Sequence, residues 1–296
     1  MTKKDKSTKS SKTEQKPKGA AKRSTRTVMS IAKNARKPLE DRVAALAEAP
    51  LAVCETDENL QTMLSILSNK DEPVEVRLAA LQSLQAASFS VIAFESCRGE
   101  YIATLRKVAL DPDPELRQRI LGILAREKDG FAQKKLLEGL QDPAKALLSP
   151  EKALQLLSYD PHAEAYSIAR EIVDKPPNTT AKREALRLLA ADATAAPLFE
   201  KLLRDKDELT EIRQISASAL QAIKPDKLQE HAREILLDTS EQDDIQATSL
   251  TALTQFGDAE AVAKDDVLLK RVDKLSNEAS KKIKQGARQF LSKYGQ

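Results

Sequence analysis

The strongest constraint on the fold of this chain is a motif that recurs along it. Each clear copy begins with Asp, has Arg six positions later with an aliphatic residue just before it, and has Leu seven positions after the Arg. The clear copies contain Asp71 and Arg77, Asp111 and Arg117, and Asp207 and Arg213. A motif that recurs at intervals of roughly 20–50 residues indicates a repeat architecture.

Weaker copies of the motif extend the series in both directions. The positions equivalent to the arginine are Arg42, Arg77, Arg117, Pro150, Lys182, Arg213, Gln246 and Lys284, and successive positions are 31 to 40 residues apart. Apolar residues follow the i, i+3, i+4, i+7 spacing of an amphipathic helix, and no run alternates with a period of two. Because one helix pair cannot bury its apolar stripe alone, the sequence predicts an all-α solenoid of about eight stacked antiparallel helix pairs.

These motifs resemble the HEAT repeat, in particular the short bacterial kind also found in phycobilisome-lyase-like repeats. The resemblance covers about residues 39–291 and is most specific in the second, third and sixth copies. The other copies depart from it, with Arg36 in place of Asp and with Pro150, Lys182, Gln246 and Lys284 in place of Arg. In HEAT proteins the arginine reaches the aspartate of a neighbouring repeat, so the resemblance implies such a ladder for Arg77 and Arg117.

The acidic residues of the motif are expected at helix starts. Asp113 precedes Pro114, an order typical of an N-cap residue followed by proline at the first helical position. Asp71 and Asp207 are expected to cap helices in the same way, because a carboxylate there binds free amides at the positive end of the helix dipole. The residues assigned to caps and ladder are Asp71, Arg77, Asp111, Asp113, Arg117, Asp207 and Arg213.

Patterns typical of catalysis or metal binding are missing from the sequence. Neither of its two histidines is followed by Glu, whereas HEAT-type deoxyhypusine hydroxylases carry repeated His-Glu pairs for iron. HEAT-like alkylpurine DNA glycosylases depend on Trp, and this chain has none. There is also no glycine-rich phosphate-binding loop. We therefore predict no catalytic residues, no metal, no cofactor and no enzymatic activity.

The cysteines and the hydropathy bear on location. Cys54 and Cys97 lie 43 positions apart, outside any metal-binding spacing, which favours two reduced thiols in a cytoplasmic protein. The first 30 residues lack the apolar region of a signal peptide. The longest uncharged stretch, residues 78–94, is interrupted by Gln and Ser, so no membrane span is predicted.

The charge is divided unevenly. Residues 1–38 hold 13 Lys and Arg against 2 acids, whereas the remainder holds 35 against 43. Since residues 1–27 lack Leu, Ile, Phe and Tyr, we expect a disordered basic tail over 1–38, with order beginning within 28–38, and a solenoid over 39–296. Such a tail is expected to bind nucleic acid or another polyanion without sequence specificity. The alternatives are a solubilising appendage and a contact with an anionic membrane or an acidic protein. The candidate contacts are Lys3, Lys4, Lys6, Lys9, Lys12, Lys16, Lys18, Lys22, Arg23 and Arg26.

Polar residues at solvent-facing positions of the second helices predict one long partner-binding face. They are Gln82, Gln85, Arg119, Arg126, Gln155, Arg187, Gln214 and Gln221. The leading prediction is a non-enzymatic scaffold, monomeric or weakly self-associating, that binds an unidentified protein partner. The family resemblance implies a second function, an accessory subunit or chaperone-like lyase of the phycobilisome-lyase type. A third is nucleic-acid binding by the solenoid itself, if Lys182, Arg183 and Arg187 cluster on one face.

Overall fold

A computed structural model describes residues 24–295, and all regular structure in that range is helical. This confirms the predicted all-α class. Three short 3-10 helices, Pro50–Ala52, Pro143–Lys145 and Ala193–Ala195, accompany the α-helices. The α-helices are α1 (Thr25–Lys33), α2 (Leu39–Glu48), α3 (Asp57–Ser68), α4 (Val74–Ser88), α5 (Val91–Val108), α6 (Pro114–Arg126), α7 (Gly130–Gln141), α8 (Pro150–Leu157), α9 (Ala163–Asp174), α10 (Thr179–Leu189), α11 (Ala196–Arg204), α12 (Thr210–Ile223), α13 (Pro225–Leu237), α14 (Asp243–Phe256), α15 (Ala259–Ala263), α16 (Asp266–Glu278) and α17 (Lys281–Tyr294).

The helices belong to two compact units, Met1–Tyr101 and Ile102–Gln296. In the first unit α1 packs against α2, α3 packs against α4, and α2 contacts α4. Two helix pairs therefore lie side by side. Their core is aliphatic, with Leu46, Leu67 and Leu84 fully buried.

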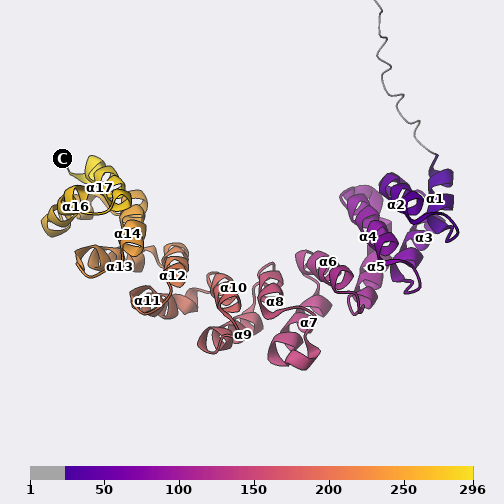
Figure 1. The fold of residues 1–296 in the computed structure, drawn as a ribbon, viewed down its shortest axis with the longest axis horizontal. Coiled ribbons are helices and arrows are strands. Elements are labelled where there is room, and N and C mark those ends of the chain that lie inside the picture. The colour runs from indigo at the N-terminus through magenta and orange to yellow at the C-terminus, as the bar shows by residue number, and fades with distance from the viewer. Residues whose placement is uncertain (1–23, 296) are drawn as a thin grey trace, which may run out of the picture. The chain divides into compact units, whose positions relative to one another are not determined.

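The second unit repeats this arrangement in chain order. Its pairs are α7–α8, α9–α10, α11–α12, α13–α14 and α16–α17, and α15 is a short additional helix before the last pair. The second helices form a continuous series in which α6, α8, α10, α12, α14 and α17 each contact the next (Figure 1). We call this series the second-helix row. Stacking in chain order confirms the predicted solenoid within this unit.

The described structure begins earlier than the sequence predicted. Order was expected to start within residues 28–38, but α1 begins at Thr25, and Ser24 caps it by accepting a hydrogen bond from the Thr27 amide at 3.3 Å. Val28, Met29 and Ala32 are buried where α1 packs on α2 and α3. These three residues lie on one face of the helix, so their burial packs α1 against its neighbours. Residues 1–23, which carry most of the predicted tail, lie outside the described residues.

The motif arginine connects consecutive helices. In α12, Arg213 donates from Nε to the Leu203 carbonyl at 2.9 Å, near the end of α11. Its two terminal nitrogens donate to both carboxylate oxygens of Glu241, at 2.8 and 2.6 Å. Arg42 makes the same contacts with the Ala32 carbonyl, at 3.0 Å, and with Glu72. We call this arrangement the arginine clamp; it occupies a helix-terminal carbonyl that has no partner within its own helix.

The clamp differs from the predicted Asp–Arg ladder. In the two complete clamps the carboxylates are Glu72 and Glu241, not the motif aspartates. Arg77 bonds the Leu67 carbonyl at 3.0 Å, as the clamp requires. Arg117 donates to three carbonyls, those of Leu147 at 2.7 Å, Asp111 at 2.9 Å and Pro112 at 3.3 Å.

Two of the proposed helix caps are wrong. The N-cap residue of α4 is Pro73 and that of α12 is Leu209, and neither helix has a side-chain cap, so Asp71 and Asp207 do not cap them. Both aspartates lie two residues before the N-cap position, in turns where their amides donate to the side chains of Asn69 and Asp205. Asp113 does stand at the N-cap of α6, where it accepts from the Leu116 amide at 2.7 Å with Pro114 following.

The prediction of reduced thiols is also wrong, because Cys54 and Cys97 form a disulfide. Cys54 lies in the connection between α2 and α3, and Cys97 is buried on α5. Their separation of 43 residues in sequence did not reveal that their Cα atoms are 6.6 Å apart. The argument from free thiols for a cytoplasmic location therefore fails.

Candidate partner-binding grooves

The second-helix row carries two adjoining grooves. The α10–α12 groove has a volume of about 400 Å³, and the α12–α14 groove about 380 Å³. Ser218 on α12 lines both, so the two share an edge. The first is lined by Arg187, Ala190, Glu211, Gln214, Ile215, Ser218 and Ala219. The second is lined by Ala217, Ser218, Gln221, Leu228, Ala247, Thr248, Thr251, Ala252, Phe256 and Lys282.

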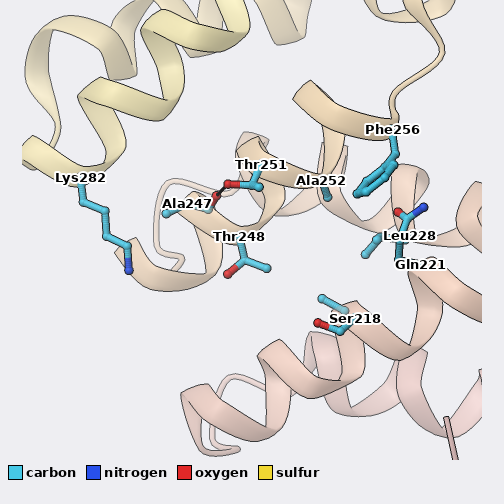
Figure 2. A pocket seen from close by; sticks show the side chains of 10 residues that line it. Ser218, Gln221, Leu228, Ala247, Thr248, Thr251, Ala252, Phe256 and Lys282 are labelled. Carbon is cyan, nitrogen blue, oxygen red and sulfur yellow. Dashed lines mark hydrogen bonds between the residues drawn. The ribbon is translucent and has the colours of Figure 1, made fainter.

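Small side chains make the α12–α14 groove possible. Where α12 and α14 face each other, the groove is lined by Ala217, Ala247 and Ala252 instead of long side chains that would fill the space. Figure 2 shows Ala247 and Ala252 on this wall. Leu228 of α13 adds an apolar side chain to the lining of the groove. The lining is therefore mainly apolar, which is typical of sites that bind apolar groups.

One acceptor in this groove has no partner. The Gln221 Oε1 atom is buried and receives no hydrogen bond from any of residues 24–295. The neighbouring hydroxyls are already used, since Thr251 donates to the Ala247 carbonyl at 2.9 Å and Thr248 donates to the Asp244 carbonyl at 2.9 Å. A buried acceptor without a partner is costly, so a bound N–H or O–H group at Gln221 would stabilise the site.

The two ends of the groove differ in chemistry. Phe256 is half exposed at one end and Lys282 lies at the other (Figure 2). Lys282 pairs with Asp244 at 2.5 Å, so this end is polar without net charge. Gly257 ends α14 directly after Phe256, and a Cβ there would collide with the Leu253 carbonyl oxygen. Glycine is therefore needed for the turn that positions the Phe256 ring.

Charges around the α10–α12 groove are paired as well. Arg187 bonds Glu184 on its own helix, and Arg183 of α10 bonds Glu211 of α12. Lys182, at the motif position of α10, bonds Glu208 in the connection before α12. The basic cluster expected at Lys182, Arg183 and Arg187 is thus neutralised by carboxylates, which does not favour nucleic-acid binding at this place.

Three of the eight predicted partner-face residues line the grooves, namely Arg187, Gln214 and Gln221. Gln214 bridges the row by donating to Thr248 Oγ1 at 3.4 Å. Arg119, Arg126 and Gln155 are exposed on α6 and α8 of the same unit, outside both grooves. Gln82 and Gln85 lie on α4 of the first unit. Arg26, from the predicted polyanion-binding set, is exposed on α1, and the other members of that set lie outside the described residues.

Sequence reasoning missed the residues that shape the α12–α14 groove. Ser218 on α12 and Thr248 and Thr251 on α14 are small hydroxyl residues, and Phe256 is a large apolar side chain that is half exposed. Small residues at helix positions that face solvent were a usable signal. Lys282 could not be found this way, because it comes from α17, after the intervening α15–α16 segment.

Titratable groups outside the grooves have structural partners. His231 of α13 contacts Glu200 of α11 through Nε2 at 3.0 Å, and His162 places Nδ1 2.8 Å from the Asp160 carbonyl. Burial opposes the charged form of Glu241, but hydrogen bonds from Arg213 and from the Gln242 amide outweigh it and lower the pKa of this carboxyl.

Within residues 24–295, no three His, Cys, Asp or Glu side chains gather as a metal site would require. No helix in that range is long and apolar enough to cross a bilayer.

The first unit exposes apolar side chains near its disulfide. Leu51, three residues before Cys54, is 86% exposed, and Ile92 at the start of α5 is 95% exposed. Phe89, in the turn before α5, is 80% exposed. These residues, too, were not identified from the sequence.

Comparison with solved structures finds matches of low similarity. No family model matches the chain, and no curated protein matches it. A solved structure of human deoxyhypusine hydroxylase in complex with glycerol matches with a TM-score of 0.35 and 14% identity, over 83% of this chain and 99% of that one. The complex of CpcE and CpcF of phycocyanin lyase from Nostoc sp. PCC7120 matches with a TM-score of 0.27 and 13% identity, over 96% and 99%.

These matches correct one prediction. The chain was expected not to be an enzyme because it lacks catalytic motifs, yet the similar structures are those of a hydroxylase and a lyase. The prediction that this chain is not an enzyme is therefore not kept.

Proposed function

We propose that this chain binds a segment of a protein partner along the second-helix row, through the two adjoining grooves between α10 and α14. The observation that supports this most is that the grooves share Ser218 and are lined by neutral or charge-paired groups. Such a surface suits an uncharged, partly apolar segment. The unpartnered Gln221 acceptor adds a requirement for one hydrogen-bond donor.

The helix spacing sets the size of this segment. Neighbouring helices pack about 8–10 Å apart, so α10 to α14 spans about 20 Å. An extended peptide rises about 3.3 Å per residue, so about six residues cross both grooves. One apolar side chain of the segment fills the space over Ala217, Ala247 and Ala252, and a backbone N–H meets Gln221.

The test is to fill the shared edge. Ser218 is exposed, so Ser218→Trp occupies both grooves without entering the core. The matched control is Lys201→Trp on an exposed position of α11. Proteins that bind the wild-type chain are recovered from native cells and identified by mass spectrometry. The Lys201→Trp variant is expected to recover the same proteins, and the Ser218→Trp variant is expected not to bind them. If both variants retain the same partners, the grooves are not the binding surface.

For the basic residues before α1, we propose a role as a tether to polyanions. Nine Lys and Arg lie between Lys3 and Arg23, and their affinity for phosphate is expected to fall steeply with salt. Replacing all nine by Gln is expected to reduce the salt dependence of duplex DNA binding. An unchanged slope of log affinity against log salt contradicts the tether.

A further inference from the structure

The two last helix pairs carry opposite charge. Residues 225–256, which form α13 and α14, hold 2 Lys and Arg against 7 acids, whereas residues 266–294, which form α16 and α17, hold 8 against 3. On α17 alone there are five Lys and Arg and no acid. This segregation places most of the cations of the C-terminal region on its last helix.

Three of these cations share one side of α17, where Lys281 and Arg288 are exposed and Lys284 is partly buried. Ile283, Ala287, Phe290 and Tyr294 face the core, so Lys281, Lys284 and Arg288, at i, i+3 and i+7, lie on the other side. None of the three makes an ion pair within the part of the chain that the structure describes. The remaining two are engaged, since Lys282 pairs with Asp244, and Lys293 donates to the Thr254 carbonyl and lies over the Tyr294 ring. We call Lys281, Lys284 and Arg288 the basic face.

The basic face lowers helix stability where it stands. Lys281 and Lys284 are in the first turn of α17, where cations oppose the positive end of the helix dipole. Ser280 is the N-cap residue but makes no side-chain capping bond. The backbone amides of this turn therefore add to the positive potential. An anion placed there relieves both the dipole and the repulsion between the cations.

We propose that the basic face binds the phosphate backbone of a nucleic-acid duplex without reading its sequence. Its neutral neighbours, Gln285, Gln289 and Ser292, are hydrogen-bond donors of the kind that contact phosphate and sugar. No large apolar side chain is exposed on α17, which disfavours membrane insertion and the apolar core of a protein interface. The eight residues from Lys281 to Arg288 span about 10 Å, the length of about three phosphates along one strand.

The test compares two triple variants of the full chain, each losing three positive charges. Lys281→Gln/Lys284→Gln/Arg288→Gln removes the basic face. The control, Arg119→Gln/Lys227→Gln/Lys264→Gln, removes cations that each pair with a glutamate on their own helix. Binding to a random-sequence DNA duplex is measured from about 50 to 300 mM salt. Far-UV circular dichroism and thermal midpoints check that both variants fold.

Loss of the basic face is expected to reduce the slope of log affinity against log salt by about 2.7, or 0.9 per cation, and to weaken binding on the order of a hundredfold at 0.1 M salt. The control is expected to match the wild type. The proposal is overturned if the wild type does not bind the duplex or if both triple variants bind alike. It is also overturned if polyglutamate or anionic vesicles compete as well as DNA of equal charge. The partner-binding proposal is independent of this outcome, because the grooves do not include the basic face.

Discussion

Helices α12 and α14 are neighbours in the second-helix row, and the residues at their equivalent motif positions make different hydrogen bonds. Arg213 of α12 is fully buried, and its guanidinium bonds the Leu203 carbonyl and both oxygens of Glu241. Gln246 of α14 is also buried, but it reaches only the Glu241 and Asp238 carbonyls, and its Oε1 atom has no partner among the described residues. The difference shows that the clamp needs the guanidinium, because the shorter amide of Gln246 reaches carbonyls only.

The pair after α14 is attached by apolar contacts instead. Leu250, Leu253, Val272 and Phe290 belong to one buried cluster that joins α14 to α16 and α17. Tyr294 completes this cluster, with its hydroxyl donating to the Leu253 carbonyl at 2.9 Å. The second unit thus combines an ionic joint at α11–α12–α14 with an apolar joint at α14–α16–α17, and each joint can be broken separately.

The largest effect is expected from Arg213→Met. The variant leaves Glu241 buried without its cation, which costs about 3–5 kcal/mol of unfolding free energy. Urea unfolding monitored by circular dichroism measures this loss. Arg204→Met, which removes an exposed pair with Glu234, is the control and is expected to cost less than about 1 kcal/mol. Equal losses of unfolding free energy for the two variants would show that the buried clamp stabilises the fold no more than an exposed ion pair does.

Phe290→Leu tests the apolar joint. The smaller side chain leaves a partial cavity in the cluster, and we expect a loss of about 1–2 kcal/mol. Hydrogen exchange is expected to increase in α16 and α17 more than in α11 and α12, whereas Arg213→Met produces the reverse pattern. Exchange that increases uniformly in both variants would contradict two separate joints.

The pH dependence of the unfolding free energy tests the contribution of Glu241 to the ionic joint. The pKa of Glu241 is lowered by folding, so its stabilisation is present above the unfolded pKa, about 4.3, and is lost as pH falls through the lower folded value. The unfolding free energy of the wild type is therefore expected to fall more steeply below about pH 4 than that of Glu241→Gln. Parallel curves for the two proteins would assign the acid sensitivity to other carboxylates.

Gln246→Met is expected to have the smallest effect. It removes one unpartnered acceptor, which is favourable, together with the Nε2 hydrogen bonds to two carbonyls, which is unfavourable. These contributions nearly cancel, so the unfolding free energy is expected to change by less than about 1 kcal/mol. A loss as large as that of Arg213→Met would mean that Gln246 acts as a clamp after all.

The periodicity of the sequence was sufficient to predict the fold class, because a helix-pair repeat buries one apolar stripe per helix in every copy. It was insufficient for the clamp, since the partner of Arg213 is Glu241, 28 residues later and in a different connection. Asp207, the motif aspartate nearest to Arg213 in sequence, is not the partner of this guanidinium. The disulfide was missed for the same reason, as the contact between Cys54 and Cys97 depends on how the α2–α3 connection packs on α5.

For the grooves, the sequence was sufficient to predict some of the lining residues but not that a groove lies between them. Arg187, Gln214 and Gln221 were predicted from their solvent-facing positions, and they do line the grooves. The α12–α14 groove is lined by alanines, and whether small side chains leave a groove depends on how far apart the two helices pack. That distance is a property of the folded row and not of any one motif.

The most direct test of the account is hydrogen–deuterium exchange of the full chain, alone and with the partner recovered in the Ser218→Trp comparison. Protection is expected in residues 210–221 and 245–256, which carry most of the walls of both grooves, with little change in α11 and α16. Protection confined to α11, α16 or the first unit would contradict partner binding by the second-helix row.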